Sequence, residues 1–388
     1  MTIGLEAEPA RGARGAASMG SGIRRIGVEE ELLLVDAETF LPRPVAGSIL
    51  RRGDLILPGG SRLEAEVKRE QIEIVSAPAT THAELLAAVI AGRRAADELA
   101  QRVGARAVAL AAPHAPCEPH LVHAPRYDRM RSRFGLTMDE QLTCGLHVHV
   151  TIASADEGVA VLDRIRPWLP VLLALSSNSP FWYGVDSRFA SYRYQAWSRW
   201  PGAGAYDRFG SAKGYAAAVA GALASGVPLD HGMIYFDARL STHAPTVEIR
   251  VSDVCLDPRD AACIGVMVRA LAETAVAEWH RGVAAPETST SLLRLASWRA
   301  SRWGLGGQLV DPLTERLVPA RSAVDALFAH VREAFASADE AHTVRARLDD
   351  ILARGTGADL QRRAAARGGA GAIVEDALAL ASGRGATG

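Results

Sequence analysis

The spacing of hydrophobic and polar residues changes several times along the chain, and each spacing predicts a different element. Residues 26–35 are mostly aliphatic, and residues 70–76 (EQIEIVS) alternate polar with apolar side chains. Both patterns predict strands. From Thr80 to Gly104, apolar residues recur at helical spacing behind a threonine and a glutamate suited to capping, which predicts a helix. The chain therefore begins with strands that are followed by a long helix.

The middle of the chain contains further strand patterns, and residues from Pro258 onward are mainly helical in pattern. Residues 112–130 are rich in proline and histidine and are expected to form a loop. We infer that this loop closes over a substrate. The other predicted elements are strands at 106–111, 142–152, 231–240 and 246–254, a helix over 156–177 and a short helix near 213–223.

The two ends of the chain have weaker patterns. Residues 1–22, rich in Gly, Ala and Arg, are expected to be a disordered leader, and residues 371–388 a weakly specified tail. The most apolar run, 168–182, is interrupted by Pro170 and is too short to span a bilayer. Residues 23–370 are therefore expected to form a single domain.

Composition excludes several classes of function. Among 388 residues, 43 are basic and 44 acidic, which gives a net charge of −1. No global basic field attracts nucleic acid or a membrane surface, so neither is expected as a partner. The four cysteines lack CxxC spacing, which argues against a zinc knuckle or a disulfide framework and indicates reduced thiols in a cytoplasmic protein. The chain has neither GxxxxGK[ST] nor a GxGxxG that opens a helix after a strand, so phosphate binding cannot depend on either motif.

Three predicted strands each carry a pair of polar residues at positions i and i+2. The pairs are Glu29 with Glu31, His147 with His149, and Glu248 with Arg250. Side chains two apart share one face of a strand, about 6.6 Å from each other, so Glu30 should point the opposite way. Such pairs on an inner face lose solvation unless they are paired or bind cations. Oxygen-rich ligand sets suit Mg²⁺ or Mn²⁺.

Each pair also has a plain structural interpretation. The glutamates could form a solvated edge strand, since charge runs usually face water. The two histidines could be an ordinary polar face or a satisfied core pair. Glu248 and Arg250 could form a cross-strand ion pair. Because all three pairs occur together, we favour a metal site.

Six segments occur along the chain in this order: GVEEEL, EVKREQIEIVSAP, TCGLHVHV, LALSSNSPFWYGVDSRFASYR, SRWPG and PTVEIRVSDV. Together they resemble the carboxylate–amine ligase family of bacterial type 2 glutamate–cysteine ligases. The resemblance covers roughly residues 24–300.

The resemblance implies an α+β fold of the glutamine-synthetase-like type, with a curved, mostly antiparallel sheet and helices packed on its outside. Residues 23–370 would then be one catalytic ligase domain around a funnel for ATP and metal. The implied reaction joins a carboxylate to an amine through an acyl phosphate, with weak glutamate–cysteine ligase activity on amino-acid substrates. A homodimer is also implied.

The resemblance assigns roles to matching positions. The family's metal ligands would be Glu29, Glu31, Glu66, Glu73, His147 and Glu248. Arg250 would contact phosphate, and His149 stands where more distant relatives carry asparagine. Glu66 and Glu73 are seven positions apart, which places them on opposite faces of a regular strand, so a bulge, bend or loop must intervene.

Arginines must supply most of the cationic groups, because the chain has only two lysines, Lys68 and Lys213. Arginine binds phosphate or carboxylate with two parallel hydrogen bonds. Arg193 is the candidate for the substrate carboxylate or the ATP phosphates, against a surface arginine stacked on an aromatic ring. Arg199 is a further candidate for nucleotide binding, and Arg188 is also available.

Two other functions fit parts of the pattern. A metal-dependent amide hydrolase could use the HxH pair and carboxylates to activate a zinc-bound water, and it would show no ATP requirement. An inactive binding protein that keeps the fold would be expected to have lost some of the matched glutamates or Arg250, and none is missing.

Overall fold

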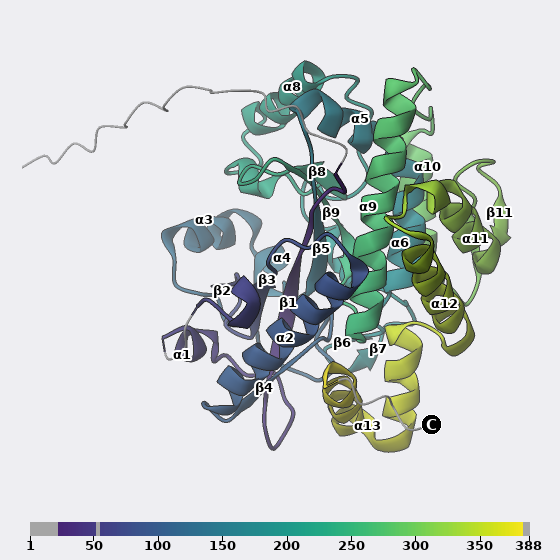
Figure 1. Cartoon of the computed structure of the whole chain (residues 1–388). Helices are drawn as coiled ribbons and strands as arrows, with labels where there is room; N and C mark the ends of the chain where they lie inside the picture. Colours follow the sequence, from purple (N-terminus) through teal and green to yellow (C-terminus); the bar gives the residue numbers. More distant parts are fainter. Residues whose placement is uncertain (1–21, 52–54, 383–388) are drawn as a thin grey trace, which may run out of the picture.

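The structure, a computed structural model, describes residues 22–51 and 55–382 (Figure 1). Apart from Gly22, the expected leader lies outside the described residues. Among the described residues, no helix combines the length and the apolar character needed to cross a membrane. The four cysteines are free, as the sequence predicted.

A seven-stranded sheet forms the centre of the fold, and all its neighbouring strands are antiparallel. The order is β2-β3-β1-β5-β9-β8, and β4 pairs with the end of β1 beyond its contact with β5. The predicted antiparallel sheet is confirmed. Its strands are β1 (Ile26–Asp36), β2 (Arg62–Ala65), β3 (Gln71–Val75), β4 (Ala105–Val108), β5 (Gly145–Thr151), β8 (Ala238–Leu240) and β9 (Thr246–Asp253).

Helices cover one face of this sheet (Figure 1). Alternate residues of the central strands, such as Val28, Leu146 and Val148, are buried in one hydrophobic core with these helices. The helices that pack on this face are α2 (His82–Gln101), α5 (Ala155–Ile165), α6 (Leu169–Ser176) and α9 (Pro258–His280). The intervening residues of the same strands are polar and point to the other face.

Helix α2 begins as the sequence predicts. The side chain of Thr81 accepts a hydrogen bond from the backbone N–H of Glu84, and the Glu84 carboxylate accepts one in return from the backbone N–H of Thr81. This capping box satisfies two of the N–H groups left free at a helix start.

Glu30 points into the helix-covered face, opposite to its neighbours, as predicted. Arg93 of α2 donates to both of its carboxylate oxygens, at 2.9 and 2.5 Å. Both side chains are 2% exposed. The same guanidinium donates to the carbonyl oxygens of Cys255 and Leu256, so the ion pair ties α2 to the segment that follows β9.

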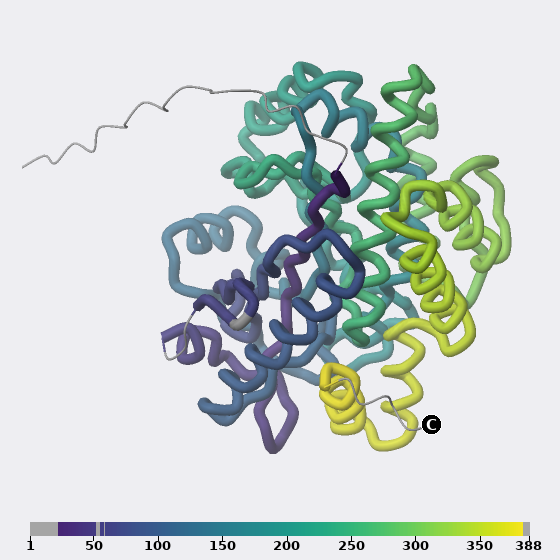
Figure 2. Tube along the Cα trace, in the orientation of Figure 1, coloured from purple at the N-terminus to yellow at the C-terminus, as the bar shows by residue number. Residues whose placement is uncertain are grey.

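The C-terminal third is mainly helical and lies along one side of the molecule (Figure 2). We expected residues 371–388 to be weakly specified, and this was wrong for residues 371–381, which belong to a helix whose Ile373, Val374 and Ala377 are buried. The elements after α9 are α10 (Thr290–Trp303), β10 (Gln308–Val310), β11 (Leu317–Pro319), α11 (Ala320–Val331), η4 (Arg332–Ala334), α12 (Ala338–Arg354) and α13 (Gly357–Ala381).

Three other predictions need correction. The helix expected over 156–177 is broken between α5 and α6 by the 3-10 turn η2 (Arg166–Trp168), where Pro167 and Pro170 lack the N–H groups of a continuous helix. Only Ala238–Leu240 of the strand expected at 231–240 pairs with the sheet, because residues 231–233 form the 3-10 turn η3 (His231–Met233). The loop expected to reach residue 130 ends at Ala124, where α3 (Pro125–Phe134) begins.

The remaining elements are short or lie at the surface, and α8 confirms the helix predicted near 213–223. They are α1 (Ala46–Leu50), η1 (Pro58–Gly60), α4 (Leu136–Asp139), β6 (Phe181–Trp182), β7 (Val185–Asp186), α7 (Tyr192–Trp197) and α8 (Ala212–Ala224).

The buried ion pair generates a stability prediction. Arg93→Met leaves the Glu30 carboxylate buried without its partner, and we expect it to lower the free energy of unfolding by about 3–5 kcal/mol. Glu30→Leu combined with Arg93→Met should recover most of that loss. The neighbouring pair Arg94–Glu98 is exposed, so Arg94→Met is a matched control that should change the free energy by less than about 0.5 kcal/mol. Urea unfolding measures all four proteins, and equal losses for Arg93→Met and Arg94→Met would contradict the prediction.

Candidate functional site

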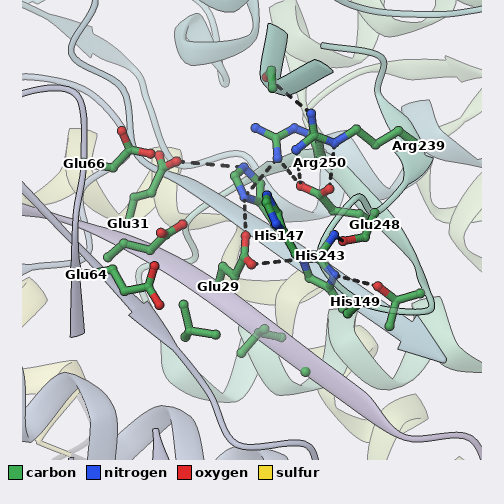
Figure 3. Close-up of a pocket in the computed structure, with 18 of the residues that line it drawn as sticks. Glu29, Glu31, Glu64, Glu66, His147, His149, Arg239, His243, Glu248 and Arg250 are labelled. Carbon is green, nitrogen blue, oxygen red and sulfur yellow. Dashed lines mark hydrogen bonds and ion pairs between the residues drawn. The ribbon is translucent and has the colours of Figure 1, made fainter. Parts of the chain in front are cut away.

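A cavity of about 1120 Å³ lies on the polar face of the sheet, slightly above the usual range of ligand pockets, about 300–1,000 Å³. Its wall contains the inward-facing residues of β1, β3, β5 and β9 together with residues of α3 and α7. The polar pairs predicted from the sequence therefore face a common space (Figure 3).

Strand register brings the pairs together. Glu29 lies opposite His147, Glu31 opposite Glu73, and His149 opposite Glu248. His147 Nδ1 is 3.2 Å from Glu29 Oε2, and His149 Nε2 is 3.2 Å from Glu29 Oε1. The Glu29 carboxylate thus lies between two imidazoles from the neighbouring strand (Figure 3).

A turn between β2 and β3 resolves the seven-residue gap between Glu66 and Glu73. Glu66 follows the last residue of β2 and Glu73 lies within β3, so both line the cavity. Lys68, inside this turn, is fully buried and donates to the carbonyl oxygen of Asp139 at 2.9 Å. Burial lowers the pKa of Lys68 to about 8. The bend required by the sequence is therefore present.

Seven side chains form three overlapping groups in which ligand atoms lie within 4.8 Å of one another. Glu29 belongs to two groups and Glu73 to two. The seven include all six predicted metal-binding residues and His149. The groups are Glu29 with Glu73 and His147, Glu29 with His149 and Glu248, and Glu31 with Glu66 and Glu73.

The carboxylates of this cluster differ in their pKa values. Burial and the neighbouring charge of Glu31 raise the pKa of Glu66 to about 8. Burial and Glu66 raise the pKa of Glu73 well above its ordinary value. Although burial opposes it, His147 and His149 lower the pKa of Glu29. Burial is the main cause of both raised pKa values, and repulsion between the carboxylates adds to it. A bound cation would relieve that repulsion. The oxygen-rich donor set therefore fits a hard divalent cation such as Mg²⁺.

Two arginines hold Glu248. Arg239 Nε and Nη2 donate to its carboxylate at 2.7 and 3.2 Å, and Arg250 Nη1 donates to Oε1. Although burial opposes it, these arginines lower the pKa of Glu248. A carboxylate has about four acceptor positions, so one further ligand still fits. The Arg250 guanidinium also lies 5.7 Å from the centre of the Trp197 ring.

Arg193 lines the cavity, as expected, and is not a surface arginine. Its side chain is 3% exposed and donates to the carbonyl oxygens of Arg250 and Val251 at 3.2 and 3.4 Å. A Cβ atom on Gly145 would lie 2.4 Å from Arg193 Nη2. The close approach of the guanidinium therefore requires glycine at position 145. The backbone N–H of Gly145 donates to the Glu31 carboxylate at 2.7 Å.

Arg199 does not line the cavity. Its guanidinium pairs with Glu140 at 2.5 Å and lies 5.9 Å from the Trp182 ring centre. The expectation that Arg199 binds the nucleotide is therefore not supported by its position. Arg188 likewise lies outside the cavity lining.

Several cavity residues were missed. Arg239 could have been found, because residues 238–240 pair with β9 and place it opposite Glu248. Tyr127 and Arg126 belong to α3, part of the segment that we expected to be a loop, and Arg126 forms a two-point ion pair with Asp230. Their proximity to the cavity is compatible with closure over a substrate, which stays a prediction.

Two of the three histidines of residues 112–124 have structural partners. His114 is buried and bonds to the carbonyl oxygen of Phe40 at 3.0 Å, and His120 pairs with the buried Glu70 at 2.7 Å. None of the three histidines in this segment lines the cavity.

Comparison with known proteins identifies the family. The family described as Glutamate-cysteine ligase family 2 matches residues 25–378. The chain belongs to this family. A relative from Paenarthrobacter aurescens (strain TC1), named "Putative glutamate--cysteine ligase 2-1", is 49% identical over 350 residues, covering 89% of this chain and 91% of the relative. "Putative glutamate--cysteine ligase 2" of Streptomyces coelicolor (strain ATCC BAA-471 / A3(2) / M145) is 46% identical over 347 residues, covering 89% of this chain and 96% of the relative.

Solved structures share the fold. A glutamate–cysteine ligase from Francisella tularensis in complex with AMP superposes with a TM-score of 0.63 at 13% identity, covering 95% of this chain and 90% of that one. A bifunctional glutathione synthetase from Pasteurella multocida gives 0.65 at 14% identity, covering 93% and 52%. The predicted glutamine-synthetase-like fold is confirmed. The member of family 2 described here is an ATP-dependent carboxylate–amine ligase, and nothing favours the hydrolase.

The neighbourhood of Arg193 also generates a pH prediction. Asp237 is 2% exposed and accepts a hydrogen bond from the Tyr194 hydroxyl at 3.0 Å. Burial raises its pKa from 3.8 to about 7. Between these values Asp237 holds a proton in the folded protein that it has released in the unfolded chain, so its contribution to stability falls as pH rises from about 4 to about 7.

We therefore expect Asp237→Asn to reduce this fall, which amounts to at most about 4 kcal/mol from the pKa difference. Urea unfolding from pH 4 to pH 8 measures it. Asp128→Asn, an exposed substitution on α3, is the control and should keep the original slope. An unchanged slope in Asp237→Asn would show that other groups cause the fall.

Proposed function

We propose that the cavity binds MgATP and two amino acids, and that the enzyme phosphorylates the carboxylate of one before the amine of the other displaces the phosphate. The observation that supports this proposal is the convergence of Glu29, Glu31, Glu66, Glu73, His147 and Glu248 on one cavity wall, beside Arg250. Carboxylates are poor electrophiles, so activation by a phosphoryl group must precede attack by an amine.

The first step transfers the γ-phosphoryl group. A carboxylate oxygen of the acid substrate attacks the γ-phosphorus, the bond to the β–γ bridging oxygen breaks, and ADP leaves. In the second step the amine nitrogen attacks the acyl carbon, the bond from that carbon to the phosphate oxygen breaks, and the nitrogen loses a proton. The products are an amide, ADP and inorganic phosphate.

The five glutamates of this set and His147 would hold Mg²⁺, or Mn²⁺, on the nucleotide phosphates. When bound, the metal neutralises phosphate charge during transfer. Arg250 is oriented by Glu248 and contacts a transferring phosphate, where a fixed cation stabilises developing negative charge. Arg193, whose side chain lines the same cavity, contacts the substrate carboxylate or the phosphates.

Glutamate and cysteine are the first substrate pair to test, because the relatives carry that name. We propose weak glutamate–cysteine ligase activity and leave other amino-acid pairs to a substrate panel. The homodimer implied by the resemblance and the cytoplasmic location inferred from the cysteines stay predictions. Light scattering of the purified protein tests the homodimer.

The decisive measurement is ADP and phosphate release from MgATP with glutamate and a panel of amines that includes cysteine. We expect release that depends on acid and amine, and a loss of about 100-fold or more in Glu29→Gln and Glu248→Gln. Glu64→Gln is the matched control, because Glu64 lies in the same wall but belongs to none of the three groups. Removal of divalent cations should abolish release, and added Mg²⁺ should restore it. Absence of ADP with every pair would contradict the proposal.

Substitution of Arg250, which lines the cavity, and of Arg199, which does not, should have different effects on activity. Arg250→Lys keeps the charge but loses the planar fork, so we expect kcat/KM for ATP to fall about 100-fold. Arg199→Ala should change it by less than about 3-fold, because its guanidinium pairs with Glu140 outside the cavity. Initial rates at varied ATP measure both, and a larger loss in Arg199→Ala would reverse the two assignments.

A further inference from the structure

The segment SSNSP (Ser176–Pro180), called the SSNSP turn below, has no part in the proposed chemistry. It is nevertheless built around a buried carboxylate. Asp253, at the end of β9, is completely buried. Its Oδ2 accepts from the backbone N–H of Asn178 at 2.8 Å and from the Ser179 hydroxyl at 2.7 Å, and its Oδ1 accepts from the Ser191 hydroxyl at 2.7 Å. These bonds fasten two separate segments to the end of β9.

The same segments fix the position of the Arg193 backbone. Ser191 caps α7, and the backbone N–H of Arg193 donates to the Ser179 hydroxyl oxygen at 2.9 Å. The backbone N–H of Tyr192 donates to the carbonyl oxygen of Ser179, also at 2.9 Å. Arg193 lies in the first turn of α7, so these bonds fix its backbone to the SSNSP turn and not to the cavity wall.

The C-terminal helix α13 also holds the SSNSP turn. Gln361 of α13 is 2% exposed, and its Nε2 donates to the carbonyl oxygen of Asn178 at 2.7 Å and to Asn178 Oδ1 at 2.6 Å. The Asn178 amide in turn donates to the carbonyl oxygens of Ala109 and Val254 at 2.9 and 2.7 Å. Asn178 is thus fixed from three sides.

Close packing at the start of α13 supports a specific fit. A Cβ atom on Gly357 would lie 2.2 Å from Asn178 Oδ1, so this position must be glycine for the helix to reach the turn. The backbone N–H of Ala358 donates to the carbonyl oxygen of Ser177 at 3.0 Å. No described residue of α13 lines the cavity, so contact between α13 and a ligand does not explain these bonds.

We propose that Gln361 and Asn178 are positioning residues for Arg193, through Asp253 and the two serines. The inference rests on the proposed function, in which Arg193 contacts the acid substrate or ATP. An arginine that binds an anion with two parallel hydrogen bonds must be held to within about 0.5 Å, and misplacement of about 1 Å by a remote substitution can cost 100-fold in rate. The C-terminal helix therefore sets ligand affinity without touching a ligand.

The test compares four variants with the unaltered enzyme: Gln361→Met, Arg193→Lys, the double variant of these two, and Val374→Ala. Gln361→Met keeps the length of the side chain but removes the donor. Val374, fully buried on the same helix without bonds to the turn, is the matched control for general destabilisation. KM and kcat are measured for the acid substrate and for MgATP, together with Tm. Gln361→Ala serves the same test if the methionine variant is not folded at the assay temperature.

We expect Gln361→Met to raise the same KM that Arg193→Lys raises, by about 10-fold. The double variant should show no further rise, because both changes act on one contact. Val374→Ala should lower Tm and leave both KM values unchanged. Amide hydrogen exchange, measured without substrates, should be faster at residues 190–194 in Gln361→Met and unchanged there in Val374→Ala.

Three outcomes would overturn the inference. If Arg193→Lys raises a KM and Gln361→Met does not, the positioning role fails and the assignment of Arg193 stands. If the two effects multiply in the double variant, Gln361 acts by a route other than Arg193. If Arg193→Lys changes neither KM, the assignment of Arg193 in the proposed function fails, and the inference that rests on it fails too.

Discussion

Repulsion between carboxylates on the inner face of the sheet is the constraint on which the rest of this structure depends. Glu29, Glu31, Glu66 and Glu73 are brought together by strand pairing, and no described lysine or arginine side chain forms an ion pair with any of them. Imidazoles lower the pKa of Glu29, whereas burial and the neighbouring carboxylates raise the pKa values of Glu66 and Glu73. The opposite face contrasts with this, because Glu30 has its own buried arginine.

Much of the site could be predicted because side chains two apart share a face of a strand. Spacing alone could place Glu29 with Glu31 on one face of their strand, and Glu248 with Arg250 on one face of theirs. The seven-residue gap between Glu66 and Glu73 correctly required a bend. The sequence could not reveal which glutamates share a cation, since that depends on the register between strands distant in the chain.

Other features depend on tertiary packing and could not be read from local pattern. Residues 188–199 contain three arginines. Arg193, in the first turn of α7, lines the cavity, whereas Arg199, just beyond the end of α7, pairs with Glu140 outside it. The Ala/Gly-rich composition of 371–381 predicts weak structure by itself. That segment is ordered because Ile373 and Val374 join a core formed with α2 and β4. Tertiary burial thus overrode the weak local preference of residues 371–381.

The buried position of Lys68 has a practical consequence for chemical modification. Of the two lysines in the chain, Lys68 is enclosed in the turn between β2 and β3, while Lys213 is exposed on α8, away from the cavity lining. Every cationic side chain that lines the cavity, histidines aside, is an arginine. Amine-selective reagents will therefore label the folded protein at Lys213 without entering the cavity, whereas dicarbonyl reagents selective for guanidinium groups will meet the site itself.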